Sequence, residues 1–185
     1  MWTNKFLYST GVHLPISVTR HEVGLFRTPR LERDHPVLMD FTTSVYVRPE
    51  HGGLTVVGAP RMSGDAIDPD NYDQVVSAET LERYLKAAKR RLPDFATAVP
   101  RGGWTGPYDN TPDLYPVLDK APGIDGLYLA AGFSGHGFKL TPAIGRVMAE
   151  LVKDGRVRDF PIEKLGLARF ERDAPVKRRY GYDWE

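Results

Sequence analysis

The stretch Gly126-Leu127-Tyr128-Leu129-Ala130-Ala131-Gly132-Phe133-Ser134-Gly135-His136-Gly137-Phe138-Lys139 joins a short apolar run to the start of a helical pattern. Residues 126–131 are apolar throughout, which predicts a strand buried on both faces. Thr141-Pro142 is a typical start of a helix, because proline has no N–H to lose in the first turn. The predicted helix carries an apolar face and ends at Gly155. The stretch therefore predicts a strand–turn–helix unit.

Three glycines shape the turn of this unit. Gly132, Gly135 and Gly137 leave the backbone accessible to a ligand because they carry no side chain. The free N–H groups and the partial positive charge of a helix start favour an anion or an electron-rich carbonyl, and Lys139 adds a full positive charge. The same glycines also suit a tight turn without any ligand. The glycines alone leave both interpretations open.

The spacing of the glycines differs from the common nucleotide motifs. The turn reads G-x-x-G-x-G, whereas the dinucleotide fingerprint G-x-G-x-x-G and the Walker loop occur nowhere in the sequence. Residues 132–136 nearly match the nucleophile elbow G-x-S-x-G of serine hydrolases, but His136 replaces the closing glycine. Those enzymes also need a histidine after the serine, and all five histidines lie at or before position 136. A serine hydrolase is therefore the less favoured alternative.

The residues before this unit predict a sheet with one helix. Alternating β-branched residues and turn signals mark strands at residues 16–23, 37–40, 44–48, 54–57 and 96–106. Their close spacing favours antiparallel pairing. Ser77 can cap a helix over residues 78–91, which Pro93 ends. We expect an α+β fold with a mixed, largely antiparallel sheet, packed helices and the strand–turn–helix unit.

The composition excludes several classes of function. The chain has 185 residues with 25 Lys+Arg and 24 Asp+Glu, so no basic excess points to nucleic acid. The absence of cysteine excludes disulfides, iron–sulfur clusters and thiol nucleophiles, and the histidines lack metal-binding spacing. No apolar run approaches the roughly 20 residues that span a membrane, and the N-terminus lacks a signal-peptide pattern. We expect a cytoplasmic protein without metal or membrane contact.

Three segments together resemble a known family. Residues 126–139, followed by Pro142-Ala143-Ile144-Gly145, resemble the C-terminal flavin-contacting region of the FAD-dependent amine and amino-acid oxidoreductases, which include D-amino-acid oxidase, glycine oxidase and sarcosine oxidase. Trp104-Thr105-Gly106-Pro107-Tyr108-Asp109-Asn110-Thr111-Pro112-Asp113 is similar to the active-site strand and turn of that family. Tyr46-Val47-Arg48-Pro49-Glu50 and Gly53-Leu54 resemble the strand pair of its substrate domain. The three matches follow the family's order, and sarcosine oxidases are the nearest branch.

The resemblance implies a division of the chain. Residues 1–120 correspond to a β-rich, substrate-binding-like domain, residues 121–155 to the C-terminal strand–loop–helix of the FAD-binding domain, and residues 156–185 to a tail. The N-terminal Rossmann half, which holds the adenine and pyrophosphate ends of FAD in the family, is expected to be missing. We therefore expect this chain alone to be inactive and to bind FAD weakly or not at all. The exposed docking surface would favour self-association.

The resemblance also implies roles for single residues. The glycine-rich turn faces the pyrimidine edge of the flavin in the family, where reduction places negative charge. A cofactor-binding role is thereby implied for Gly132, Phe133, Ser134, Gly135, His136, Gly137, Phe138 and Lys139. A catalytic role is implied for Lys139, as the cation for the substrate carboxylate, and for Tyr108, as an aromatic side chain beside the flavin. An exposed lysine and a packed tyrosine are the structural alternatives, and Trp104 is expected to pack in the core.

Two positions depart from the sarcosine oxidase pattern. Gly106 stands where those enzymes carry the cysteine that tethers FAD, so FAD is expected to bind without that covalent link. Thr55 stands where they carry a lysine that assists the reaction with oxygen, which favours a dehydrogenase. The implied reaction is oxidation of a small amine or amino acid, of the sarcosine, glycine or D-amino-acid type, by hydride transfer to flavin. A non-catalytic module that binds a ligand or partner with the same sheet is the second interpretation.

Overall fold

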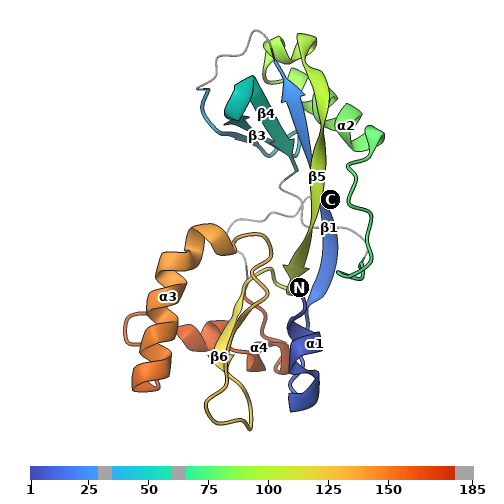
Figure 1. Ribbon diagram of the computed structural model, residues 1–185. Coiled ribbons are helices and arrows are strands. Elements are labelled where there is room, and N and C mark those ends of the chain that lie inside the picture. The colour runs from blue at the N-terminus through green and yellow to red at the C-terminus, as the bar shows by residue number, and fades with distance from the viewer. Residues whose placement is uncertain (29–34, 60–65, 178–185) are drawn as a thin grey trace. The chain divides into compact units, whose positions relative to one another are not determined.

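The structure is a computed structural model that describes residues 1–28, 35–59 and 66–177 (Figure 1). Its strands are β1 (Ser17–Arg27), β2 (Leu38–Asp40), β3 (Val45–Glu50), β4 (Leu54–Gly58), β5 (Val99–Asn110), β6 (Val117–Lys120) and β7 (Tyr128–Ala131). Its α-helices are α1 (Thr3–Leu7), α2 (Ala78–Lys89), α3 (Gly137–Asp154) and α4 (Ala168–Glu171). Short 3-10 turns cover Tyr8–Thr10, His51–Gly53, Pro93–Thr97 and Ile162–Leu165.

The chain forms two compact units that interleave along the sequence. The glycine-turn unit comprises residues 1–19, 66–69 and those from 107 onward. The sheet unit comprises residues 20–65 and 70–106. The strands β1 and β5 contribute residues to both units. The sequence predicts contiguous segments instead, at 1–120, 121–155 and 156–185, because a linear pattern does not reveal that a strand passes from one unit into another.

The sheet has the strand order β2-β3-β4-β1-β5 (Figure 1). The pairs β2–β3, β3–β4 and β1–β4 are antiparallel, which confirms the predicted sheet. The predicted strand at 96–106 is wrong at both ends, because Pro93–Thr97 forms a 3-10 turn and β5 continues to Asn110. Its extension beyond residue 106 carries Tyr108 into the glycine-turn unit.

Helix α2 begins at the predicted residue, Ala78, and ends at Lys89, two residues before the predicted end at Arg91. The Ser77 hydroxyl caps the helix by accepting a hydrogen bond from the Thr80 N–H at 3.1 Å. The helix packs Tyr84 and Ala88 into a buried cluster of apolar side chains from β1, β3, β4 and the Pro93–Thr97 turn. Tyr84 and Ala88 therefore lie on the face of α2 that packs against the sheet.

His21 on β1 makes the stability of the sheet unit depend on pH. Burial lowers the pKa of His21 from 6.5 to about 4, although the charge of Glu22 opposes this shift. The unfolded state then binds a proton below about pH 6.5 that the folded state takes up only near pH 4. We expect stability to fall as pH drops through this window, by up to about 3 kcal/mol. Urea unfolding of the His21→Gln variant should show a flatter dependence between pH 6.5 and 4.5.

The matched control for this prediction is His51→Gln, because His51 is an exposed histidine in the same unit. That variant should keep the slope of the unaltered chain. An equal slope in His21→Gln and in the unaltered chain would show that a group other than His21 causes the pH dependence.

The strands β6 and β7 form a separate antiparallel ribbon of two strands. Leu129 and Ala131 are buried in a cluster with Leu7, Leu14 and Val117, whereas Ala130 is exposed. The prediction of a strand at 126–131 buried on both faces is therefore wrong. A two-stranded ribbon has one covered face here, and apolar residue types alone did not distinguish the covered face from the open one.

Helix α3 begins at Gly137, four residues before the predicted start at Thr141. No side-chain cap hydrogen bond marks its N-terminus, and the His136 N–H donates instead to the Phe133 carbonyl at 2.9 Å. Gly155 ends the helix as predicted, with φ at 70° and its N–H bonded to Leu151 O. The earlier start brings Gly137, Phe138 and Lys139 into the first helical turn.

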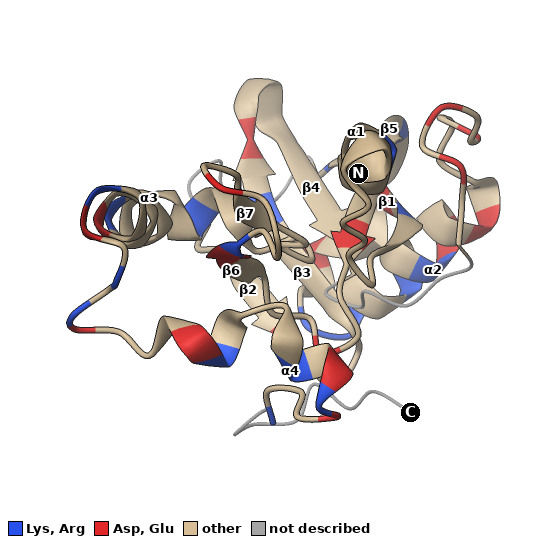
Figure 2. Ribbon diagram, turned by 90° about the horizontal axis from the view of Figure 1, so that it is seen from below, with Lys and Arg blue, Asp and Glu red and all other residues tan. Residues whose placement is uncertain are grey.

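Charged residues of both signs lie next to each other along α3 (Figure 2). Arg146 and Glu150 form an ion pair one turn apart, at 2.8 Å. Within residues 1–28, 35–59 and 66–177, none of the helices has the length and apolar character needed to cross a membrane.

Candidate functional site

The end of β5 and the turn after β7 are joined by three hydrogen bonds. The Gly132 N–H donates to Asp109 Oδ2 at 3.1 Å, and the Ser134 N–H donates to the Asp109 carbonyl at 3.0 Å. The Thr111 N–H donates to Ser134 Oγ at 3.2 Å. Two segments more than 20 residues apart in the sequence therefore form one structural element.

Ser134 supports the turn from the inside. Its side chain is fully buried, its φ is 50°, and its hydroxyl donates to the Gly132 carbonyl at 3.3 Å while accepting from Thr111. A nucleophilic serine must instead present its oxygen to a substrate beside a base. The geometry of Ser134 therefore supports a structural role and disfavours the serine hydrolase interpretation.

Tyr108 and Gly135 are in close contact. A Cβ atom placed on Gly135 would lie 2.6 Å from Tyr108 Cε2, and the φ of 75° at Gly135 also favours glycine. Gly135 is exposed while Tyr108 is half-buried. Burial raises the pKa of the Tyr108 phenol above its usual value, so the hydroxyl stays protonated at neutral pH. The phenol of Tyr108 is therefore neutral where its ring contacts Gly135.

The start of α3 offers three backbone donors. The N–H groups of Gly137, Phe138 and Lys139 have no acceptor inside the helix, because the first turn lacks preceding carbonyls. Phe138 is 98% exposed and Lys139 is exposed. Within the described ranges, Lys139 forms no ion pair. These donors and this cation fit an electron-rich carbonyl or an anion.

The predicted site residues thus separate into two groups. Gly132 and Ser134 hold the turn against β5, and Phe133 packs beside Gly137, whose added Cβ would lie 3.1 Å from the Phe133 Cβ. The second group lies on the accessible side of the turn and comprises Gly135, His136, Gly137, Phe138 and Lys139. The structure brings Tyr108 to Gly135, at the beginning of this second group.

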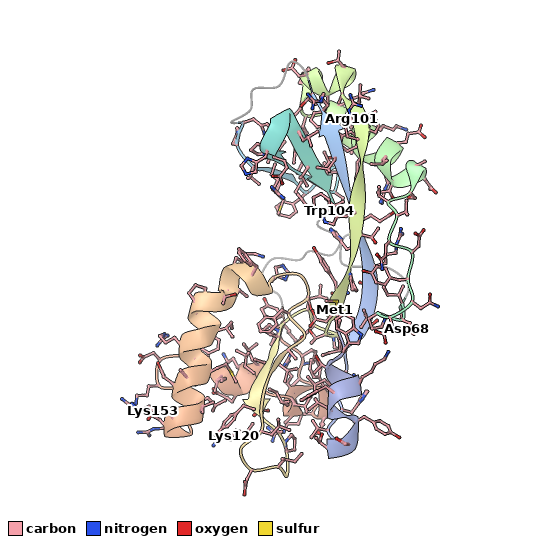
Figure 3. All side chains as sticks on the ribbon, viewed as in Figure 1. Met1, Asp68, Arg101, Trp104, Lys120 and Lys153 are labelled. Carbon is pink, nitrogen blue, oxygen red and sulfur yellow. The ribbon has the colours of Figure 1, made fainter. Side chains whose placement is uncertain are left out.

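Two other predicted residues lie in the sheet unit. Trp104 on β5 is 43% exposed, so its predicted packing in the core is wrong (Figure 3). Its position on β5 falls in a run of exposed residues that begins at Val99. Thr55 on β4 is buried, and its hydroxyl lies 3.2 Å from the hydroxyl of Thr28.

Arg169 was missed by the sequence analysis. It is buried and donates to both carboxylate oxygens of Asp113, from Nε at 2.8 Å and from Nη2 at 3.0 Å. Its remaining donors bind the carbonyls of Leu165, Gly166 and Tyr115. Burial opposes the charge of Asp113, but hydrogen bonds from Arg169, Val176 and Tyr115 together hold the pKa of that carboxyl below its usual value. No motif or periodicity marks Arg169, which lies in the segment predicted only as a tail.

Two further expectations concern metal and the tail. Among the residues that the structure describes, no three His, Asp or Glu side chains gather as a metal site would require. The predicted tail at 156–185 includes residues 178–185, which lie outside the described residues.

Comparison with known proteins identifies the family. The profile described as DAO, FAD dependent oxidoreductase, matches residues 1–151. FAD-dependent oxidoreductase domain-containing protein 1 of Xenopus laevis is 29% identical over 172 residues, which cover 91% of this chain and 34% of that protein. Monomeric sarcosine oxidase of Bacillus sp. (strain NS-129) is 28% identical, over 94% of this chain and 47% of the enzyme. The chain belongs to the FAD dependent oxidoreductase family.

The fold comparison agrees with this assignment. The crystal structure of L-proline dehydrogenase from P. horikoshii has a TM-score of 0.79 and 27% identity, over 95% of this chain and 46% of that one. FAD is the cofactor of the family to which the chain belongs. The chain spans less than half the length of these relatives.

Proposed function

We propose that residues 132–139 and Tyr108 form the part of an FAD site that contacts the pyrimidine edge of the flavin. The observation that carries this proposal is the accessible start of α3, where three backbone donors and Lys139 lie beside the Tyr108–Gly135 contact. A flavin bound there would supply a hydride acceptor whose pyrimidine edge becomes negatively charged on reduction. Backbone donors and a cation at that edge stabilise this charge.

The proposed reaction of the whole protein is the oxidation of a small amine or amino acid to an imine. Lys139 binds the substrate carboxylate, since it is exposed and forms no ion pair with a described residue. Tyr108 supplies a protonated hydroxyl next to the turn. The similarity to a sarcosine oxidase and to an L-proline dehydrogenase supports a secondary or primary amine with a carboxylate.

The test is a titration of the ¹⁵N-labelled chain with FMN, which carries the flavin ring without adenine. We expect the amide resonances of Gly135, Gly137, Phe138 and Lys139 to shift, with weak affinity because the ring is held at one edge. Reduced FMN should produce the same shifts at lower concentration, because the backbone donors favour the charge that reduction creates.

Inorganic phosphate is the control for this titration, because a helix N-terminus also attracts the phosphate group of FMN. Equal shifts with phosphate alone and with FMN would show that the turn binds an anion and not the ring. The absence of shifts at millimolar FMN would contradict the proposal directly.

A further inference from the structure

We propose that Arg169 is a positioning residue for the glycine-rich turn, and this inference rests on the proposed function. Arg169 lies beyond residue 151, where the match to the family profile ends. It is nevertheless among the most buried charged residues of the described chain, with 3% of its side chain exposed. Its partner Asp113 is equally buried, at 2%. A charge at such depth requires complete pairing, which the five donors of the guanidinium provide.

The first step of the connection runs from Arg169 to the turn after β5. Asp113 receives the bidentate hydrogen bonds of Arg169 and also accepts from the N–H groups of Tyr115 and Val176. The Thr111 hydroxyl lies 3.2 Å from Asp113 Oδ1 and 2.7 Å from the Tyr115 carbonyl, which also accepts from Arg169. The ion pair therefore fixes Thr111 from two sides.

The second step runs from Thr111 to the glycine-rich turn. The Thr111 N–H donates to Ser134 Oγ, and this hydroxyl donates to the Gly132 carbonyl. A Cβ atom on Gly132 would lie 2.5 Å from Thr111 Cγ2, so the side-chain methyl group of Thr111 packs directly against Gly132. Ser134 holds a positive φ of 50°, a conformation that needs support from its surroundings. Thr111 supplies this support on one side of the turn.

Arg169, Asp113, Thr111, Ser134 and Gly132 thus form a continuous relay inside the glycine-turn unit. One end is the segment around α4, and the other end is the turn whose accessible side is proposed to contact the flavin ring. Loss of the bidentate hydrogen bonds between Arg169 and Asp113 should therefore change the conformation of the turn, although every residue of the turn is retained. Through this relay, the segment after α3 supports the turn that is proposed to contact the flavin.

The experiment compares Arg169→Lys with Thr111→Val in the ¹⁵N-labelled chain. Lysine keeps the positive charge but loses the bidentate geometry, and valine keeps the shape of threonine without its hydroxyl. We expect both variants to shift the amide resonances of Gly132 and Ser134 and to weaken FMN binding about tenfold, the equivalent of one hydrogen bond to a charged group. Thr111→Val should leave the Arg169 Nε–H resonance in place, since it preserves the ion pair.

The control is Leu151→Ala, which removes a buried side chain of α3 about 21 Å along the helix from Gly137. This variant should lower stability and leave the Gly132 and Ser134 resonances and the FMN affinity unchanged. Unmoved resonances in Arg169→Lys, or the same shifts in Leu151→Ala, would overturn the relay. An unaltered chain that binds no FMN would overturn the proposed function, whereas the Gly132 and Ser134 resonances test the relay even without FMN.

Discussion

Replacement of Arg169 by alanine is expected to lower the free energy of unfolding of the glycine-turn unit by about 3–5 kcal/mol. The guanidinium of Arg169 is 3% exposed and satisfies both oxygens of a carboxylate that is 2% exposed. Its removal leaves the charge of Asp113 buried without its cation, and it also leaves the carbonyls of Leu165 and Gly166 without these donors. The expected loss is large because total stabilities of domains are only about 5–15 kcal/mol.

The measurement is urea unfolding followed through amide resonances of β6 and β7, which report on the glycine-turn unit alone. Asp113→Ala should destabilise by a similar amount. The double variant Asp113→Ala/Arg169→Ala should lose less than the sum, because neither charge is then left unpaired. Arg158→Ala is the matched control, since Arg158 forms an exposed ion pair with Asp154 and should contribute little. An Arg169→Ala variant as stable as this control would contradict the interpretation of the buried pair.

The buried pair also determines how acid affects the glycine-turn unit. The pKa of Asp113 lies below its ordinary value in the folded protein, so the unfolded state takes up a proton first as pH falls. The stabilisation by Asp113 is complete above its unfolded pKa and is lost as pH falls through the folded pKa. His21 lowers the stability of the sheet unit already at higher pH. The carboxyl of Asp40, whose pKa the Arg91 hydrogen bonds hold below its usual value, adds a loss in that unit at lower pH.

The sequence predicted elements whose signals are local. Helix α2 combines a serine cap, a periodic apolar face and a proline stop, and all three act within a few residues. The paired strands β3 and β4 were equally predictable from alternation and turn signals. The start of α3 was not, because it depends on a turn that β5 holds from 20 residues away and on no capping side chain.

The candidate site likewise combines features that local sequence signals predict with features that depend on distant contacts. The glycine spacing and the resemblance located residues 132–139, and the extension of β5 that brings Tyr108 against Gly135 followed only from the structure. The burial of Ser134 and the pairing of Arg169 with Asp113 depend on contacts between distant segments. Composition and spacing do not reveal such contacts. Ser134, Arg169 and Asp113 could therefore be identified as supports of the turn only from the structure.

Replacement of Gly135 by alanine is expected to weaken binding of FMN by about 5–30-fold. A side chain at φ 75° costs about 1–2 kcal/mol, and each 1.4 kcal/mol corresponds to a factor of ten in affinity. The new Cβ would also lie 2.6 Å from Tyr108 Cε2 and 3.0 Å from Tyr108 Cζ, so the aromatic ring must move. Both effects act on the side of the turn that carries the backbone donors.

The matched control is Gly145→Ala, because Gly145 lies in α3 with open space around its Cβ position. This variant should gain up to about 1 kcal/mol in stability from helix propensity and keep the FMN affinity of the unaltered chain. The combination of Gly135→Ala with Tyr108→Ala removes the ring contact and leaves the backbone strain. Because Tyr108 is itself proposed to contact the flavin, the double variant is compared with Tyr108→Ala alone. A double variant that binds FMN more weakly than Tyr108→Ala would show that strain in the turn contributes, whereas a Gly135→Ala chain that binds FMN normally would exclude this turn as the flavin contact.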